Sequence, residues 1–284
     1  MADRDSQSGE LDLIEDPDER AQIEAENALR QTQAAMELLP AWIAASQPVL
    51  RPSLFLKLHG VLMKRISRYP GVFRPGAMSI SHSRHQPPPP DEVSFLVEEL
   101  CDYVNRHWGD RSALHLAAYV LWRTNWIHPF SDGNGRTARI VSYLILCAHT
   151  RTELPGSLTI PKQIASAKQP YYDALEDADR HFRNGEIDVE VLEQLLGSCL
   201  ARQLLDFFES AGGRTEGVDP TLQSEIDDAL AVARAQERRA RDAQPILPSA
   251  RGSRSWLDAL ERRPVLYGAI VTVIVTVVGW LLSR

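Results

Sequence analysis

The chain has 284 residues, 24% of them charged, and a formal net charge of −7. This length allows one sizeable domain with appendages, and the composition is that of a globular protein. The acidic balance comes with no basic stripe containing aromatic residues, so nucleic acid is excluded as a partner. Three cysteines without clustered spacing predict buried free thiols.

The N-terminal part combines an acidic lead with a long helix. Residues 1–15 carry several carboxylates and no apolar run, which predicts a short disordered lead. A helix is predicted over 17–39, because Asp16 can accept hydrogen bonds from its first turn. Glu24 and Glu26 lie about 200° apart on this helix, so only one of them can face a given neighbour.

The rest of the domain is also predicted to be helical, which gives an all-α fold class over residues 16–210. Further helices are expected at 53–66, 91–107, 111–127, 134–149, 169–183 and 188–209. The exception is the segment 71–90, where alternating side chains before four prolines favour a strand over a surface loop with a polyproline spacer. The strand-compatible residues are Met78, Ser79, Ile80 and Ser81.

The segment 128–136 reads His-Pro-Phe-Ser-Asp-Gly-Asn-Gly-Arg and is the most informative part of the chain. Pro129 disfavours helical geometry at His128, so the preceding helix is predicted to end there. The two glycines then lie at the N-terminus of the helix 134–149. Free backbone N–H groups and the helix dipole make such a terminus an anion site.

The side chains of this segment fit the chemistry of group transfer from a polyphosphate. His128 titrates near neutrality and can accept a proton from an attacking hydroxyl. Asp132 offers the hard oxygen ligand that Mg²⁺ prefers, and Arg136 and Arg139 share one helix face toward a phosphate tail. A Ser-His-Asp hydrolase built on Ser131 is disfavoured, because no strand-to-helix elbow surrounds it.

At these residues the chain resembles the Fic family of protein adenylyltransferases, whose signature is complete from His128 to Arg139. The resemblance implies a helical bundle with one β-hairpin flap. It also implies transfer of AMP from ATP to a Tyr, Thr or Ser hydroxyl, with His128 as base and Asp132 holding Mg²⁺. Doc-type kinases lack the glycine present here as Gly135, which favours nucleotidyl transfer. The implied nucleotide-binding residues are Asp132, Gly133, Asn134, Gly135, Arg136, Thr137, Arg139, Tyr171 and Tyr172.

The resemblance assigns specific roles to six of these positions and to the segment 71–90. Asn134 and its flanking glycines would hold the α- and β-phosphates, and Arg136 would hold the β/γ end. The pair Tyr171–Tyr172 would line the adenine pocket, although a tyrosine pair on a helix also suits core packing. The segment 71–90 would be the flap, which aligns the target by main-chain pairing.

The predicted helix 17–39 also resembles an inhibitory helix found in many Fic proteins, with the pattern Ser/Thr-x-x-x-Glu-Gly/Asn. Glu26 matches the glutamate, but Gln22 replaces the Ser/Thr, and Glu24 is a second candidate. The resemblance implies an inhibitory pair between Arg139 and one of these glutamates. The alternative is a solvated acidic helix face.

The C-terminal part differs in character. Residues 211–263 are predicted to be a linker with a marginal helix. Residues 264–282 contain no charged side chain and would span about 28 Å as a helix, close to a bilayer core. Tyr267 and Trp280 lie near the two ends and Arg263 precedes the run. This predicts a single-pass membrane anchor with the enzyme on the cytoplasmic side, against a buried terminal helix or strand.

The leading hypothesis is therefore a membrane-anchored protein adenylyltransferase that uses ATP and Mg²⁺. Alternatives within enzymes are another donor, such as UTP, GTP or a CDP-alcohol, and removal of AMP. A catalytically silent nucleotide-binding adaptor and a toxin–antitoxin component are alternatives of other classes. The expected partners are a target protein, a lipid bilayer and a second copy in a homodimer.

Overall fold

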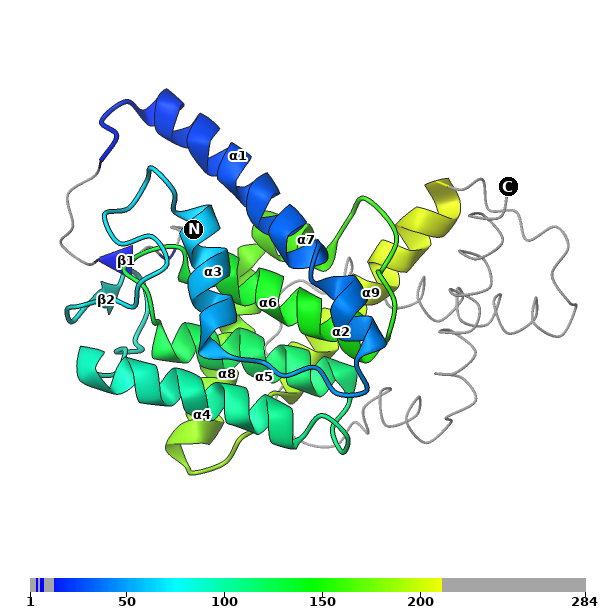
Figure 1. Cartoon of the computed structure of the whole chain (residues 1–284). Helices are drawn as coiled ribbons and strands as arrows, with labels where there is room; N and C mark the ends of the chain where they lie inside the picture. The colour runs from blue at the N-terminus through cyan, green and yellow to red at the C-terminus, as the bar shows by residue number, and fades with distance from the viewer. Residues whose placement is uncertain (1–3, 5, 8–12, 211–284) are drawn as a thin grey trace, which may run out of the picture. The chain divides into compact units, whose positions relative to one another are not determined.

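A computed structural model describes Arg4, Ser6–Gln7 and residues 13–210 (Figure 1). The predicted linker, 211–263, and the predicted membrane anchor, 264–282, lie outside the described residues. Within the described part of the chain, no helix combines the length and apolar character needed to cross a membrane.

The chain divides into two compact units, one of residues 1–153 with 164–195 and the other of residues 154–163 with 196 onward. Helices α7 (Ile160–Ser166) and α9 (Glu190–Ser210) each have residues in both units. The first unit holds the predicted motif and is mostly helical. Its helices are α1 (Pro17–Met36), α2 (Leu39–Ala44), α3 (Pro52–Leu62), α4 (Val93–Arg106), α5 (Ala113–Ile127), α6 (Asn134–His149) and α8 (Lys168–Arg183), with a 3₁₀ turn at Pro90–Glu92.

Helices α5 and α6 form the core of this unit. Both are buried on nearly all sides, which is expected of a central helix surrounded by others. Helix α6 contacts α1, α2, α3 and α5, and α5 also contacts α4 and α8. The Ser142 hydroxyl of α6 donates to the backbone oxygen of Ala117 in α5 at 2.8 Å, so its burial costs no unpaired polar group. The two helices that flank the motif are therefore largely buried among their neighbours.

Helix α1 packs on α3 and α6 through a stripe with a spacing of four residues. The buried members are Ile23, Asn27, Gln31 and Ala35. Asn27 and Gln31 donate from their amides to the backbone oxygens of Lys64 (2.7 Å) and Leu58 (3.2 Å). Ile23 packs in an apolar cluster with Leu62, Met63 and Ile66. These contacts fix the rotation of α1 about its axis and hence the direction of its glutamates.

The end of α1 differs from the prediction. It stops at Met36, and Leu39–Ala44 forms the separate helix α2. Pro40 explains the break, because a proline inside a helix clashes with the carbonyl four residues earlier, which here belongs to Met36. At the other end, the Asp16 carboxylate accepts from the N–H groups of Asp18 (2.9 Å) and Glu19 (3.3 Å), as predicted for the cap.

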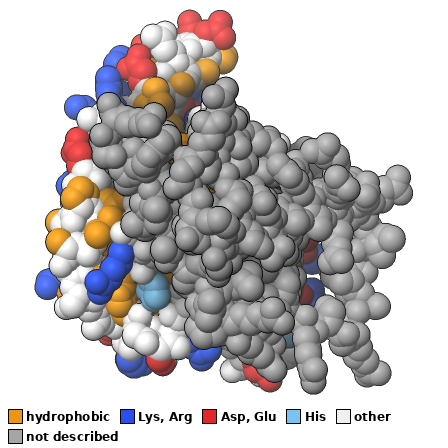
Figure 2. Space-filling view, turned by 90° about the vertical axis from the view of Figure 1, so that its right-hand side faces the viewer, with side chains coloured by type: hydrophobic (Ala, Val, Ile, Leu, Met, Phe, Trp, Pro, Cys, Tyr) orange, Lys and Arg blue, Asp and Glu red, His pale blue; other side chains and the backbone are white. Residues whose placement is uncertain are grey.

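The outer side of α1 is a mixed-charge surface. At the top of Figure 2, where Figure 1 places the start of α1, acidic and basic side chains stand next to one another. Glu26 pairs with Arg30 at 3.2 Å, both side chains being about half exposed. Pairs of this kind contribute about 0.3–0.5 kcal/mol. Glu26 therefore belongs to a solvated helix face.

The predicted β-hairpin is wrong. The segment 71–90 contributes one strand, β2 (Ser79–Ile80), which pairs antiparallel with β1 (Ser6–Gln7) from the N-terminal lead. Residues 81–86 form no strand, and the prolines at 87–90 have no N–H to donate to a ladder. The lead predicted to be disordered over 1–15 thus supplies the missing strand.

The described part of the second unit is organised around the buried amide of Gln203. Its side-chain oxygen accepts from the Ile160 N–H at 3.1 Å, and its nitrogen donates to the Pro155 oxygen at 2.9 Å.

The three cysteines of the chain, Cys101, Cys147 and Cys199, are all buried and free, which confirms the prediction of buried thiols.

Candidate active site

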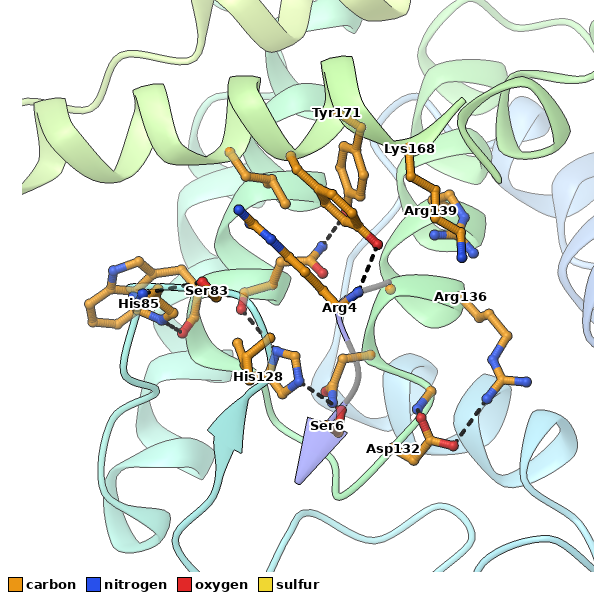
Figure 3. Close-up of a pocket in the computed structure, with 18 of the residues that line it drawn as sticks. Arg4, Ser6, Ser83, His85, His128, Asp132, Arg136, Arg139, Lys168 and Tyr171 are labelled. Atoms are coloured by element: carbon orange, nitrogen blue, oxygen red, sulfur yellow. Dashed lines mark hydrogen bonds and ion pairs between the residues drawn. The ribbon is translucent and has the colours of Figure 1, made fainter. Parts of the chain in front are cut away.

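A cavity of about 530 Å³ is lined by the end of α5, the start of α6, α8, β2, α1 and the N-terminal lead (Figure 3). It contains most of the residues that the sequence predicted for the site. Those in its wall are Glu24, Ile80, His128, Asp132, Gly133, Asn134, Gly135, Arg136, Arg139, Tyr171 and Tyr172. The predicted residues outside its wall are Glu26, Met78, Ser79, Ser81 and Thr137.

His128 lies directly after α5 in a left-handed conformation, with φ 52°. The His128 N–H still donates to the backbone oxygen of Thr124 at 2.9 Å, but the His128 backbone is no longer helical. This confirms the prediction that the helix ends before Pro129. Left-handed backbone is unfavourable for a residue with a side chain and must be held by its surroundings. The buried Arg74 does this, because its Nε–H donates to the His128 backbone oxygen at 2.8 Å.

The imidazole of His128 is arranged as a proton acceptor. Its Nδ1–H donates to the backbone oxygen of Asn125 at 3.2 Å, which leaves the lone pair on Nε2. Burial lowers the pKa of His128 to about 4, so the ring is neutral at pH 7. A neutral ring with its free nitrogen in the cavity has the form that a general base requires.

The loop after His128 is held by interactions with its own backbone and with α3. Phe130 is fully buried and stacks on the ring of His59, with centroids 3.7 Å apart. His59 accepts from the Gly71 N–H and donates to the Asp132 backbone oxygen, both at 3.0 Å. These contacts anchor the loop in the core.

The Asn134 side chain braces the same loop. Its oxygen accepts from the Phe130 N–H at 2.8 Å and its nitrogen donates to the Phe130 oxygen at 2.7 Å. The amide predicted to hold phosphates is therefore occupied by the main chain. What Asn134 offers to an anion is its backbone N–H.

The first turn of α6 offers a set of backbone donors. The N–H groups of Asn134, Gly135 and Arg136 have no hydrogen-bond acceptor among the described residues, as expected for the start of a helix. Gly133 lies before them with φ 74°, which glycine adopts without strain. A Cβ atom on Gly135 would lie 3.3 Å from Nη1 of Arg139. The two glycines thus allow the turn and leave its donors accessible.

A network of four charged side chains crosses from α1 to α6. Glu24 pairs through Oε2 with Nη1 of Arg136 at 3.2 Å and through Oε1 with Nε of Arg20 at 3.1 Å. Arg136 also pairs with Asp132 at 3.1 Å, and Arg20 approaches the same Asp132 oxygen at 3.9 Å. The carboxylate predicted to bind a metal and the guanidinium predicted to bind phosphate therefore contact each other and Glu24 (Figure 3 shows the Asp132–Arg136 pair).

The predicted partner of the inhibitory glutamate needs correction. Glu24 contacts Arg136, and no carboxylate within the described part of the chain pairs with Arg139. The rotation of α1 set by its buried stripe directs Glu24 to the first arginine of the motif. Glu26 is held by Arg30 on the exposed face. Of the two candidates, Glu24 is the one that lies in the cavity wall.

Arg139 and the tyrosine pair form another part of the cavity. Burial lowers the pKa of Arg139, and the nearby hydroxyls of Tyr171 and Tyr172 partly oppose that shift. Tyr171 is fully buried and accepts a 2.7 Å hydrogen bond from the Asn125 amide, whereas Tyr172 is half-buried. Core packing thus describes Tyr171, and Tyr172 presents its ring to the cavity.

The N-terminal lead enters the cavity, which the sequence did not predict. The Ser6 hydroxyl lies 2.9 Å from Nε2 of His128. The Arg4 guanidinium lies over the Tyr172 ring, 4.5 Å from its centroid. Figure 3 shows Arg4 and Ser6 pointing among the motif residues.

Sequence reasoning also missed residues that position the motif. Arg74 and His59 are isolated in the sequence and belong to no pattern, so no signal marked them. Asn125 lies three residues before His128 on a helix that was predicted, and helical spacing could have identified it. Lys168, at the start of α8, lines the cavity as a further cation.

Comparison with known proteins agrees with this geometry. A family model described as the Fic/DOC family matches residues 49–146. The curated "Protein adenylyltransferase Fic" of Drosophila virilis is 25% identical over 177 residues, which are 62% of this chain and 34% of that protein. The protein of the same name from Culex quinquefasciatus is 25% identical over 213 residues, which are 73% of this chain and 39% of that protein. The chain thus spans between a third and two fifths of these relatives.

Among solved structures, a Fic domain-containing signaling protein from Bacteroides thetaiotaomicron is similar, with a TM-score of 0.54 and 21% identity. The match covers 68% of this chain and 74% of that one, and it shows the fold. Together the comparisons show that this chain is similar to Fic/DOC family proteins over residues 49–146, and the curated relatives are named as adenylyltransferases.

Proposed function

We propose that the protein transfers the adenylyl group of ATP to a hydroxyl side chain of a protein and releases pyrophosphate. One observation carries this proposal: the unprotonated Nε2 of a neutral His128 faces a hydroxyl in the same cavity as the first N–H groups of α6, which have no acceptor among the described residues. The first feature suits an attacking alcohol and the second suits phosphate oxygens. The names of the curated relatives agree with it.

In the proposed reaction, His128 acts on the attacking group. The acceptor hydroxyl gives its proton to Nε2 while its oxygen bonds to the α-phosphorus. The hydrogen bond from Nδ1 to Asn125 keeps the ring in the required tautomer and stabilises the imidazolium that forms. Arg74 contributes by holding the His128 backbone in place.

The phosphates would be held by α6 and its neighbours. The N–H groups of Asn134, Gly135 and Arg136 and the guanidinium of Arg139 can stabilise charge on the phosphate oxygens. The half-buried ring of Tyr172, over which the Arg4 guanidinium lies in this structure, would offer a stacking surface for the base once Arg4 moves aside.

The residues of the cavity fit a Mg²⁺ ion that would be held mainly by the phosphates of the nucleotide. The described residues contain no cluster of three or more His, Cys, Asp or Glu side chains that could hold a metal alone. Mg²⁺ bound with nucleotides commonly takes one or two protein carboxylates together with phosphate oxygens. Asp132 is the residue that would hold it, and the ion when bound would neutralise phosphate charge.

The proposal includes a restraint by Glu24. In the structure its carboxylate neutralises Arg136, which the proposed reaction needs for the phosphate tail. ATP would have to displace Glu24 from this guanidinium.

The anchor predicted at 264–282 would place the targets at the cytoplasmic face of a membrane. A vesicle flotation assay that compares the full chain with a chain ending at residue 210 would test this.

The decisive experiment labels ATP separately at the α- and γ-phosphates and measures labelled protein with and without His128. Transfer of the α label alone, lost in a His128→Asn variant, is the expected result. Transfer of the γ label alone would mean a kinase and overturn the proposal. A panel of nucleotides with mass spectrometry identifies the donor, and labelling that survives loss of His128 would point to a catalytically silent binding module.

A further inference from the structure

Two described residues of the N-terminal lead, Ser6 and Gln7, form the strand β1 at the edge of β2. In β1, Ser6 stands opposite Ile80 and Gln7 opposite Ser79, in antiparallel register. Pairing of main chains at a strand edge holds a peptide whatever its side chains are. The register therefore fixes the Ser6 backbone beside the cavity.

A second, independent set of contacts holds the lead two residues earlier. The Arg4 N–H donates to the Tyr172 hydroxyl at 3.4 Å, and its guanidinium lies over the ring and pairs with Glu176. The Arg4 side chain is only 14% exposed. Helix α8 and strand β2 thus hold the lead on both sides of position 5.

Between these anchors the Ser6 side chain points at the base. Its hydroxyl lies 2.9 Å from Nε2 of His128. Because Nδ1 of that ring donates to Asn125, Nε2 has no proton, and the Ser6 hydroxyl must be the donor of this bond. A hydroxyl that donates to a general base is poised for activation as a nucleophile.

We propose that Ser6 is an acceptor of the nucleotidyl group within its own chain, so that the lead is a built-in substrate of the active site. This inference rests on the proposed function. The Ser6 proton passes to Nε2 of His128, and the serine oxygen forms a bond to the α-phosphorus of ATP. The bond from that phosphorus to the oxygen bridging the β-phosphate breaks, pyrophosphate leaves with the electron pair, and the product is a phosphodiester on Ser6.

The cavity has room for this reaction. Arg4 and Ser6 are part of its wall, so its volume of about 530 Å³ is the space that remains with the lead in place. Cavities of about 300–1,000 Å³ are typical of small-molecule sites. The N–H groups of α6 and the side chain of Arg139 line the same space, so the donor phosphates and the acceptor hydroxyl have separate positions.

The test is α-labelled ATP with the full chain, followed by digestion with trypsin and fragment-ion mass spectrometry. The tryptic peptide 5–20 contains two hydroxyl side chains, Ser6 and Ser8. We expect AMP on Ser6 in the wild type. Labelling of this peptide should be lost in Ser6→Ala, retained on the new threonine in Ser6→Thr, and unchanged in the matched control Ser8→Ala. A tagged His128→Ala chain mixed with active chain should stay unlabelled, since the reaction is intramolecular.

The outcomes separate the two proposals. In one outcome, AMP transfer depends on His128 but labels only added proteins or other residues, and never Ser6. This outcome would overturn the inference and leave the proposed function in place. Label on the tagged inactive chain would overturn the intramolecular step. No AMP on any protein, with wild type and Glu24→Gln alike, would overturn the proposed function and this inference with it.

Discussion

Replacing Glu24 by glutamine should raise the rate of AMP transfer, because it removes the negative charge that occupies Arg136. The Oε2–Nη1 distance is 3.2 Å and the two side chains are 31% and 26% exposed. A partly exposed pair whose members are shared with Arg20 and Asp132 is strongly screened. We therefore assign it about 1 kcal/mol, at the upper end of exposed pairs, which corresponds to about fivefold. Glutamine is preferred to glycine, which by itself costs about 1 kcal/mol in a helix.

The assay measures initial rates of transfer from α-labelled ATP below saturation, together with ATP affinity. Glu24→Gln should increase both by about fivefold, and the gain should shrink as salt rises, since screening already weakens the pair. Glu26→Gln is the matched control on the same helix and should stay within about twofold. Equal gains from the two variants, or none from Glu24→Gln, would refute the restraint.

Four further predictions concern the motif and the residues that support it. His128→Asn removes the base but retains a residue that tolerates left-handed backbone, so transfer should fall by about 10²–10⁴ while the melting temperature changes little. Since burial lowers the pKa of His128 to about 4, single-turnover rates should rise through that pH and be level above pH 6, whereas a rise centred on 6.5 would contradict it. The pKa of His59 is lowered to about 4 as well. Between pH 6.5 and 4 the unfolded chain therefore binds more protons at His59 and His128 than the folded chain does. The free energy of unfolding, measured by denaturant titration, should fall as pH falls through that window. In Gly135→Ala, the new Cβ lies 3.3 Å from Nη1 of Arg139, a flexible group, so the melting temperature should hold while ATP affinity drops.

The parts that the sequence predicted well depend on local rules. Pro129 limits the backbone of its neighbour whatever the fold, so the end of α5 at Ile127 was predictable. The start of α6 at Asn134 follows in the same way from Gly133, which precedes it. Most residues of the motif lie close together because the twelve residues from His128 to Arg139 form a turn and the start of α6, where the chain advances only about 1.5 Å per residue.

The parts that it could not predict depend on packing between distant segments. Whether Glu24 meets Arg136 or Arg139 is decided by the rotation of α1, which Ile23 fixes in its cluster on α3. The part that the Asn134 side chain plays in bracing the loop was not predicted, because it depends on the amide donating to the backbone oxygen of Phe130. A two-residue strand such as β1 has too few residues to show any alternation.

The N-terminal segment acts on the motif at two separate points. Glu24 neutralises Arg136 at the start of α6, where phosphate charge would be held. Ser6 occupies His128 at the end of α5, where an acceptor would be activated. The two contacts share no side chain, so the energies of their removal should be nearly independent. Under the proposed function, the first contact would control access of the donor and the second would control access of the acceptor. A target protein would then have to displace β1 from β2 before it could pair with that strand and present its own hydroxyl to His128.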